Sequence, residues 1–325
     1  MQLSVCIPTY NHGSLVTTAI ESVLKQSYQD FEIVVVDNAS TDNTEQILSR
    51  FTDPRIRYFR NLVNLGFSRN LQRSFELAQG EFLQFLCADD FLYANCLQRT
   101  VTFLLQHPHA AFVHTGHNLV DPTGKSVETR IYEWKSLVSG KEFLEQLMEW
   151  GIAGVCLSSV VMRREYLERV GGIDMDLEFA ADYGMWMKLS FLGEVGYVPQ
   201  ALVAYRVHAD QTTRILIPKL RLKLVEKFLG HARANEVPTQ RYGDRLLREA
   251  VSEGLREFPK RRKAGVSVVT LVTEAKDMLK KYRRHVHLFP DLFYIFLALF
   301  PPFFLEGVYR FHSSVRKNDK SSSRK

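Results

Sequence analysis

The sequence is short of the residues that build disulfide, zinc and glycine-rich phosphate-binding motifs. Its four cysteines lie far apart, at Cys6, Cys87, Cys96 and Cys156. No Cys-x-x-Cys pair occurs, which argues against a zinc site or a redox motif. Each cysteine lies in an apolar stretch, so we expect buried free thiols in a reducing compartment. Neither Gly-x-Gly-x-x-Gly nor Gly-x-x-x-x-Gly-Lys occurs, so dinucleotide-binding and P-loop interpretations lose their main support.

The sequence also has no long hydrophobic run and no basic N-terminal leader. The longest uncharged apolar stretch near the C-terminus covers 14 residues, 292–305, and Pro301-Pro302 interrupts it. A membrane-spanning helix needs about 20 apolar residues, so a spanning helix is disfavoured while an interfacial one stays open. The first residues lead directly into a strand-like run, and we expect no signal peptide.

The composition is that of a globular protein with an uneven distribution of charge. Of the 325 residues, 46% are hydrophobic and 24% are charged, and this length suits one large domain or two. Residues 1–213 have 17 basic and 25 acidic side chains, whereas residues 214–325 have 25 basic and 11 acidic ones. The asymmetry suggests chemistry in the first part and anchoring in the second.

Strand-like runs alternate with segments whose apolar residues recur at helical spacing. We expect strands at residues 3–7, 31–36, 55–60, 81–86, 111–117 and 158–163. We expect helices at residues 14–26, 44–51, 68–78, 141–150, 165–170 and 183–192, and basic helical segments from about 218 to 281. This alternation predicts an α/β fold with a mostly parallel sheet and helices on both of its faces.

Polar residues follow three of the predicted strands. They are the segments 8–11 (PTYN), 37–42 (DNASTD) and 89–90 (DD). Ligands bind beyond the carboxyl ends of the strands in open α/β sheets, so these loops would converge on one crevice. Adjacent carboxylates are costly to leave unpaired there, and Mg²⁺ or Mn²⁺ would relieve their repulsion. The alternative is that Asp89 and Asp90 form only a helix cap and a solvated turn.

The order of motifs along the chain resembles the GT-A-fold glycosyltransferases of family 2, the large inverting group. The resemblance covers roughly residues 2–210 and is specific because the motifs occur as an ordered set. The motifs are the segments 5–11 (VCIPTYN), 33–42 (IVVVDNASTD), 64–70 (NLGFSRN), 80–90 (GEFLQFLCADD), 171–174 (GGID), 181–186 (ADYGMW) and 205–208 (YRVH). The resemblance implies a Rossmann-like, mostly parallel sheet flanked by helices, followed here by a helical basic C-terminal extension.

The resemblance also implies roles for individual residues. The residues that would bind a nucleotide-sugar donor are Pro8, Thr9, Tyr10, Asn11, Asp37, Asn38, Arg69 and Asp90. Asp89 would bind Mg²⁺ or Mn²⁺ on the donor diphosphate, and we place His208 with it at the metal. Asp182 would be the general base that takes a proton from the acceptor hydroxyl. The sequence departs from the family pattern at Cys87, where an Asp is usual, and at Ala181, where an acid usually precedes the base.

Some of these residues also have simpler interpretations. Asp182 can cap the helix that follows it, and Asp37 can be only a turn former. His208 can instead pack under the sheet, face solvent or line an acceptor pocket. The residues that we expect to be mainly structural are Asp42, Trp186, His114 and His117.

The implied activity is the transfer of a sugar from a nucleotide-diphosphate donor, with a UDP-sugar expected. The acceptor would be a glycan or a lipid-linked molecule in surface polysaccharide synthesis. One alternative is an enzyme of the same fold that uses polyprenyl phosphate as acceptor. A second is a non-catalytic, glycan-associated scaffold, for which Cys87 and Ala181 are the support.

The C-terminal region predicts where such an enzyme would work. A basic cluster at 280–284 precedes the aromatic segment 292–300. This pairing is typical of docking on an anionic membrane surface, and packing on the catalytic domain or on a second subunit is the alternative. Nucleic-acid binding has little support, because the first part of the chain is acidic. We expect a catalytic domain at 1–213, a helical basic region at 214–311 for which membrane association is an option, and a polar tail at 312–325. We also expect a cytoplasmic protein at the inner face of the plasma membrane.

Overall fold

The computed structural model describes residues 2–150, 155–208, 218–234, 243–256 and 267–282, and the single positions 237, 239 and 259. The chain divides into two units. The first is Met1–Leu216 with Gly230–Pro238, and the second is Ile217–Leu229 with Thr239–Lys325. The boundaries that we expected from the charge pattern stay predictions, and the expected polar tail at 312–325 lies outside the described residues.

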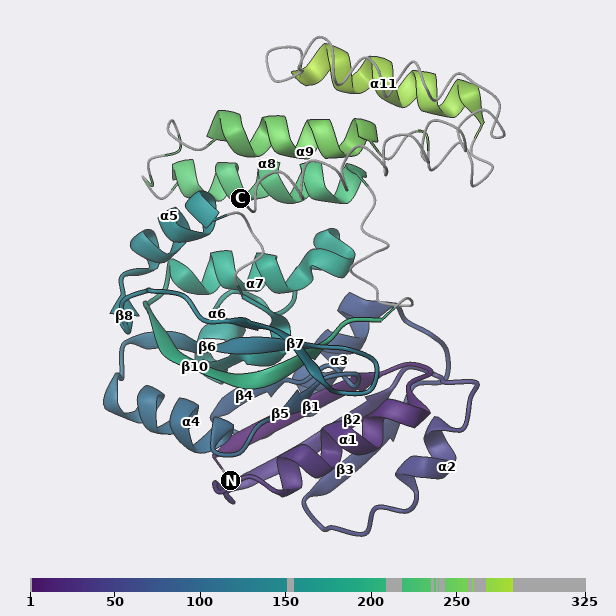
Figure 1. Ribbon diagram of the computed structural model, residues 1–325, viewed down its shortest axis with the longest axis vertical. Coiled ribbons are helices and arrows are strands. Elements are labelled where there is room, and N and C mark those ends of the chain that lie inside the picture. Colours follow the sequence, from purple (N-terminus) through teal and green to yellow (C-terminus); the bar gives the residue numbers. More distant parts are fainter. Residues whose placement is uncertain are drawn as a thin grey trace, which may run out of the picture. The chain divides into compact units, whose positions relative to one another are not determined.

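Strands and helices alternate along the first unit (Figure 1). Its elements are β1 (Leu3–Thr9), α1 (Gly13–Leu24), β2 (Phe31–Asp37), α2 (Thr44–Leu48), β3 (Ile56–Arg60), α3 (Phe67–Leu77), β4 (Phe82–Phe85), β5 (Phe91–Leu92), α4 (Cys96–Gln106), β6 (Ala110–Val120), β7 (Ser126–Arg130), β8 (Leu137–Val138), α5 (Gly140–Trp150), η1 (Leu157–Ser159), β9 (Val160–Arg163), α6 (Arg164–Arg169), η2 (Met175–Ala180), α7 (Ala181–Ser190) and β10 (Glu194–Arg206). All of the strands and helices expected for this unit are present, with ends that differ by a few residues.

Within the described residues, ten strands form one mixed sheet in the order β3-β2-β1-β4-β9-β6-β10-β5, with β7 beside β6 and β8 beside β10. The long pairings, which join β3, β2, β1 and β4 and also β6 and β10, are parallel. Strand β9 lies antiparallel between β4 and β6. Because β9 opposes both neighbours, β6 and β10 run in the same direction as β1, and all of their carboxyl ends lie at one edge. The expected mostly parallel sheet is confirmed.

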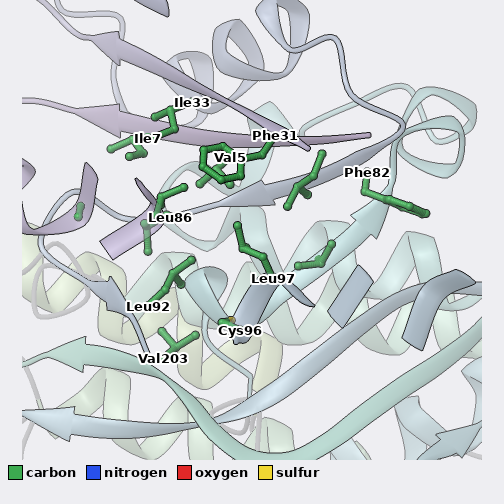
Figure 2. Close-up of a cluster of buried hydrophobic side chains, with 14 of the residues drawn as sticks. Val5, Ile7, Phe31, Ile33, Phe82, Leu86, Leu92, Cys96, Leu97 and Val203 are labelled. Atoms are coloured by element: carbon green, nitrogen blue, oxygen red, sulfur yellow. The ribbon is translucent and has the colours of Figure 1, made fainter. Parts of the chain in front are cut away.

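One face of the sheet is covered by α1, α2 and α4. Strands β1 and β2 are buried at every position, which explains why they read as continuous apolar runs rather than as alternating ones. Figure 2 shows Val5 and Ile7 of β1 in one apolar cluster with Leu97 of α4 and Val203 of β10. This shared core fixes the positions of the loops at the carboxyl ends of the strands.

The other face is covered by α3, α5, α6 and α7, so helices flank both faces as expected. The thiol of Cys6 on β1 donates to the carbonyl oxygen of Ser74 on α3 at 3.5 Å. The ring of Phe112 on β6 lies 5.6 Å from that of Trp186 on α7 and 5.3 Å from that of Phe143 on α5. Trp186 is fully buried, so it belongs to this core. All four cysteines are free thiols.

Two elements that position the site were not expected from the sequence. Helix α4 fills one core face, and the 13-residue strand β10 extends the sheet. Strand β10 pairs with β6 through register shifts between Val198 and Ala201 and between Ala201 and Val203. Pro199 lies inside this irregular stretch, where a proline does not remove a ladder hydrogen bond.

The second unit is helical where the structure describes it, as expected for the basic C-terminal region. It contains the part of α8 (Pro218–Ala234) up to Leu229, α9 (Gly243–Arg256) and α11 (Val268–Tyr282). Glu226 accepts a hydrogen bond from Tyr282 at 2.6 Å and forms an ion pair with Lys281 at 2.7 Å. None of the described helices is long and apolar enough to cross a membrane. Lys280 and Lys281 of the basic cluster end α11, whereas Arg283, Arg284 and the whole aromatic segment 292–300 lie outside the described residues.

Candidate active site

The end of β2 places a buried carboxylate at the carboxyl edge of the sheet. Asp37 is fully buried and accepts hydrogen bonds from the backbone N–H of Ser40 at 2.9 Å and from the Tyr58 hydroxyl at 3.2 Å. The Arg60 guanidinium lies 3.5 Å away. Burial, followed by the charge of Asp37, raises the pKa of Tyr58, so this hydroxyl stays a hydrogen-bond donor. Asp37 is therefore more than a turn former, because three neighbours hold its carboxylate in place.

The loop after β1 crosses directly over the loop after β2. Asn11 has a φ of 56°, and its side-chain oxygen accepts the Thr41 N–H at 2.8 Å, while its own N–H donates to the Ser40 hydroxyl at 2.8 Å. The hydroxyl of Thr9 is buried without a hydrogen-bond partner among the described residues. The Tyr10 side chain is 41% exposed at the same edge. The end of β1 and the residue after it thus supply a buried hydroxyl without a partner and an exposed aromatic ring.

Asn38 joins this crossing to the loop at residues 61–66. Its side-chain oxygen accepts from Asn61 at 3.0 Å and from the backbone N–H of Leu65 at 2.9 Å. Its side-chain nitrogen donates to Asn64 at 2.8 Å. Because both ends of the amide have protein partners, the geometry gives Asn38 a positioning role in this loop. Arg69 follows in the first turn of α3, and its side chain is exposed.

The end of β4 positions two adjacent carboxylates very differently. Asp90 is buried, and its two oxygens accept from the Ser158 hydroxyl at 2.6 Å and from the backbone N–H of Arg206 at 2.9 Å. Burial and the neighbouring Asp89 raise the pKa of Asp90 well above its ordinary value. Asp89 is turned away from these donors, and only about 15% of its side chain is exposed. The pair therefore divides into an anchored carboxyl, Asp90, and one that contacts a ring nitrogen of His208, Asp89.

The Arg206 side chain holds the Asp89 backbone against the hairpin between β6 and β7. Its Nε donates to the carbonyl oxygen of Asp89 at 2.8 Å. One terminal nitrogen donates to the carbonyl oxygens of Pro122 at 2.8 Å and Asp121 at 3.3 Å. A planar guanidinium with several donors suits this multiple contact better than a lysine ammonium would. Arg206, at the end of β10, thus fixes the loop that bears Asp89.

Three side chains that come from three different loops meet at this edge. A ring nitrogen of His208 lies 3.0 Å from a carboxylate oxygen of Asp89. The rings of His12 and His208 are 6.5 Å apart and nearly perpendicular. One possible ligand atom from each of His12, Asp89 and His208 lies within 4.8 Å of the others. The two residues that we predicted for a metal are therefore adjacent, and His12 joins them.

A second group, Cys87 with Asp89 and Asp90, satisfies the same distance limit. Burial and the two carboxylates raise the pKa of the Cys87 thiol well above its ordinary value. A protonated thiol is a poor ligand for a hard cation, and the Asp90 oxygens already have protein donors. The donor set that fits a divalent cation is the one with the two histidines.

Asp182 lies in the first turn of α7, on a segment that is tied to α3. The hydroxyl of Ser68 in the first turn of α3 donates to the carbonyl oxygen of Glu178, and Gln72 accepts from the N–H of Ile173 at 2.9 Å. Asp182 is half-buried and accepts the N–H of Tyr183 at 2.9 Å. Burial raises its pKa to about 7 against the lowering effect of this hydrogen bond. A carboxyl with this pKa can exchange a proton near neutral pH.

Strand β6 contains two buried histidines, His114 and His117. Burial lowers the pKa of His114 to about 3 and that of His117 to about 4. Both rings are therefore neutral near pH 7. Asp42 accepts from the N–H of Thr44 at 3.0 Å and from the N–H of Gly13 at 3.1 Å, which ties the starts of α1 and α2 together. These contacts are structural, in line with our expectation for the three residues.

Sequence reasoning missed His12, Arg206 and Ser158 as parts of this edge. Ser158 lies in η1, where its hydroxyl both accepts the Cys87 N–H at 3.1 Å and donates to Asp90. Arg206 and His208 share one motif, but only the histidine was assigned a role. His12 directly follows the 8–11 motif and has a side chain that binds metals, which was a usable signal.

Comparisons with known proteins agree with this geometry. The family model described as Glycosyl transferase family 2 matches residues 4–171. An uncharacterized protein of Mycobacterium tuberculosis is 30% identical over 66% of this chain and 70% of its own. An uncharacterized glycosyltransferase of Haemophilus influenzae is 26% identical over 66% of this chain and 68% of its own.

Two solved structures show the same fold. S. aureus TarS in complex with UDP-GlcNAc aligns with a TM-score of 0.67 and 19% identity, over 88% of this chain and 82% of that one. The mannosyltransferase PcManGT from Pyrobaculum calidifontis, in complex with GDP-Man and Mn²⁺, aligns with a TM-score of 0.54 and 20% identity. The alignment covers 91% of this chain and 85% of that one.

The sheet, the helices on both of its faces and the polar carboxyl edge define an α/β protein of the GT-A type. The chain belongs to glycosyl transferase family 2, because the family model matches more than half of it. The expected family, fold and enzyme class are thereby confirmed, and the protein is a glycosyltransferase.

Proposed function

We propose that the protein transfers a sugar from a nucleotide-diphosphate donor, a UDP-sugar, to an acceptor hydroxyl with inversion at the anomeric carbon. The observation that carries the proposal is the meeting of Asp89 and His208 at 3.0 Å, beside the buried Asp37 loop. Loops from β1, β2, β4 and β10 thus surround one place at the carboxyl edge, where open α/β sheets bind ligands. TarS with UDP-GlcNAc and PcManGT with GDP-Man support the class of donor.

The nucleoside part of the donor would bind over the crossing of the first two loops. The unpaired Thr9 hydroxyl and the anchored Asp37 carboxylate supply an acceptor or donor for the base and the ribose. The exposed ring of Tyr10 supplies a stacking surface. Pro8 ends the buried part of β1, while Asn11 and Asn38 hold the loops in shape through their amides.

The diphosphate would lie toward Asp89, with Arg69 as a cationic neighbour on α3. A divalent cation held by Asp89 and His208 would neutralise the charge that develops on the leaving diphosphate. Asp90 contributes by fixing the backbone between Ser158 and Arg206 rather than by direct contact. PcManGT with Mn²⁺ supports a divalent ion on this fold.

Asp182 would act as the base of a single displacement. Its carboxylate takes the proton from the acceptor hydroxyl while that oxygen forms a bond to the anomeric carbon. The bond from the anomeric carbon to the diphosphate oxygen breaks, and the electron pair leaves with the nucleoside diphosphate. The raised pKa of about 7 suits this role, because the base must be ionised before transfer and able to keep a proton after it.

The acceptor would be a glycan or a lipid-linked molecule in surface polysaccharide synthesis, and a polyprenyl phosphate is the alternative. The basic residues around Lys280 and Lys281 at the end of α11 support peripheral contact with an anionic membrane surface. This would place the protein in the cytoplasm at the inner face of the plasma membrane. Incorporation of labelled sugar into a membrane fraction, but not into free oligosaccharide, would support a lipid-linked acceptor.

A panel of nucleotide sugars with Mn²⁺ or Mg²⁺ tests the proposal, with nucleotide release and donor binding measured in parallel. The wild type is compared with Asp89→Asn and Asp182→Asn, and Asp53→Asn is the control, because Asp53 pairs with Arg55 beside the start of β3, at the opposite edge. We expect one donor to be hydrolysed slowly, with hydrolysis lost on chelation and in Asp89→Asn. Intact donor binding but no turnover in Asp182→Asn would support the base. If no nucleotide sugar binds in the presence of metal, the proposal fails and a non-catalytic scaffold takes its place.

A further inference from the structure

The histidine that follows the β1 motif has an unusual environment. His12 is the N-cap residue of α1, and its backbone carbonyl accepts the N–H groups of Leu15 and Val16 at 2.9 Å. Its side chain makes no capping hydrogen bond. The Nδ1 atom is enclosed and has no hydrogen-bond partner among the described residues. A buried polar atom without a partner is costly, so it points to a ligand that the chain itself does not supply.

The geometry of the cluster fits a cation as this ligand. Atoms bound to one cation at about 2.1 Å lie roughly 3.0 Å apart when adjacent and about 4.2 Å apart when opposite. The Asp89 to His208 distance of 3.0 Å equals the adjacent value. The third ligand atom, from His12, lies within 4.8 Å of both, so a small movement of one side chain brings all three around a single ion.

We infer that His12 is a third protein ligand of the cation, and that two imidazoles and one carboxylate make this site select Mn²⁺ over Mg²⁺. The inference rests on the proposed donor site and adds its metal specificity. Imidazole nitrogen is a ligand for transition metals, whereas Mg²⁺ prefers oxygen ligands and retains its waters. Three protein ligands hold the ion before the donor arrives, while the remaining positions stay open for diphosphate oxygens.

The inference is tested directly by measuring metal binding to the protein in the absence of nucleotide. Mn²⁺ binding is followed by the loss of the free-ion electron paramagnetic resonance signal, and Co²⁺ binding by visible absorption that reports nitrogen ligands. The variants are His12→Ala, His12→Gln and His208→Ala. The matched control is His109→Ala, because His109 is exposed just before β6, at the opposite edge of the sheet. Far-ultraviolet circular dichroism and a thermal melt check that each variant is folded.

We expect the wild type to bind Mn²⁺ at least about ten-fold more tightly than Mg²⁺. Each His12 variant should weaken Mn²⁺ binding about ten- to hundred-fold, which is the loss seen even for residues that only support a ligand. Mg²⁺ binding should change little in these variants, and His109→Ala should behave as the wild type. The Co²⁺ spectrum should change in His12→Ala and in His208→Ala.

Four outcomes overturn the inference. They are unchanged Mn²⁺ binding in His12→Ala, equal binding of Mg²⁺ and Mn²⁺ by the wild type, no Mn²⁺ binding at all without nucleotide, and weaker UDP binding in His12→Ala even with chelator present. The last result would make His12 a direct nucleotide contact. The proposed function is tested separately. If the protein turns over a donor but His12→Ala binds Mn²⁺ normally, only the assignment of His12 as a metal ligand is refuted. If the protein binds Mn²⁺ but no nucleotide sugar, only the proposed function is refuted.

Discussion

If Asp182 is the proposed base, its replacement should change activity and stability in opposite directions, and both changes can be measured. Burial raises its pKa from 3.8 to about 7, although the N–H of Tyr183 donates to the carboxylate. One pKa unit corresponds to about 1.36 kcal/mol, so the fold disfavours the ionised carboxylate by roughly 4 kcal/mol. Asp182→Asn removes that cost together with the base. The variant should therefore be inactive and, at alkaline pH, more stable than the wild type.

The direction of this change in stability with pH follows from the pKa of Asp182 in the unfolded and in the folded chain. A carboxyl whose folded pKa is raised costs nothing below its unfolded pKa of 3.8. The cost grows as the pH rises toward 7 and is complete above that value. The free energy of unfolding of Asp182→Asn, minus that of the wild type, should therefore increase by roughly 3 kcal/mol between pH 5 and pH 8.

Denaturant unfolding of both proteins across this pH range, followed by tryptophan fluorescence, gives the difference, and Trp186 reports from the same helix. The control is Asp53→Asn. The pKa of Asp53 is lowered to about 2 by hydrogen bonds from Arg55, so its difference from the wild type should stay constant between pH 5 and pH 8. In the wild type, kcat/KM should rise with pH through about 7, and Asp182→Asn should lower it about 10²- to 10⁴-fold. A stability difference that does not change with pH, or a variant that retains activity, would refute the reasoning.

Other parts of the fold give shorter tests. A Cβ on Gly140 would lie 1.5 Å from the carbonyl oxygen of Ser190. Gly140→Ala should therefore lower the free energy of unfolding by at least about 3 kcal/mol. The control is Gly230→Ala, which should be neutral or stabilise by about 1 kcal/mol, because a Cβ there would have no atom within 4 Å. Leu97→Ala should destabilise by about 2–5 kcal/mol in denaturant unfolding, because Leu97 is fully buried. Arg206→Lys should weaken Mn²⁺ binding about ten-fold or more, and unchanged binding would show that the Asp89 loop does not depend on the guanidinium.

Much of the first half of the fold was predictable because local and global signals agree there. The residues of β1 and β2 form unbroken apolar runs, and the polar segment after each run marks the carboxyl edge. Asp37 and Asp89 could therefore be placed near one crevice before any geometry was known. Helix α4 was not expected, although Leu97, Val101 and Leu104 recur at helical spacing and are all buried.

The second half was harder because tertiary pairing overrides the local signal. Strand β10 contains Pro199, which on sequence grounds argues against a long strand. The structure accommodates it at the register shifts on either side of Ala201. The cluster of His12, Asp89 and His208 was equally hidden, because three separate loops supply its members. No periodicity in the sequence relates loops that meet only after the sheet has formed.

The position of β10 explains how the side chains of the proposed donor and metal sites meet at one edge of the sheet. Its last residue, Arg206, donates its N–H to Asp90 and its Nε–H to the Asp89 carbonyl, and His208 follows two residues later. Successive side chains of a strand point to opposite faces, so a one-residue slip of β10 would turn Arg206 away from both contacts. The register shifts near Ala201 set how far β10 reaches along β6. The proposed metal site is therefore complete only when the second half of the sheet pairs in this register, so the proposed chemistry depends on β10 as much as on the acidic loop that it holds.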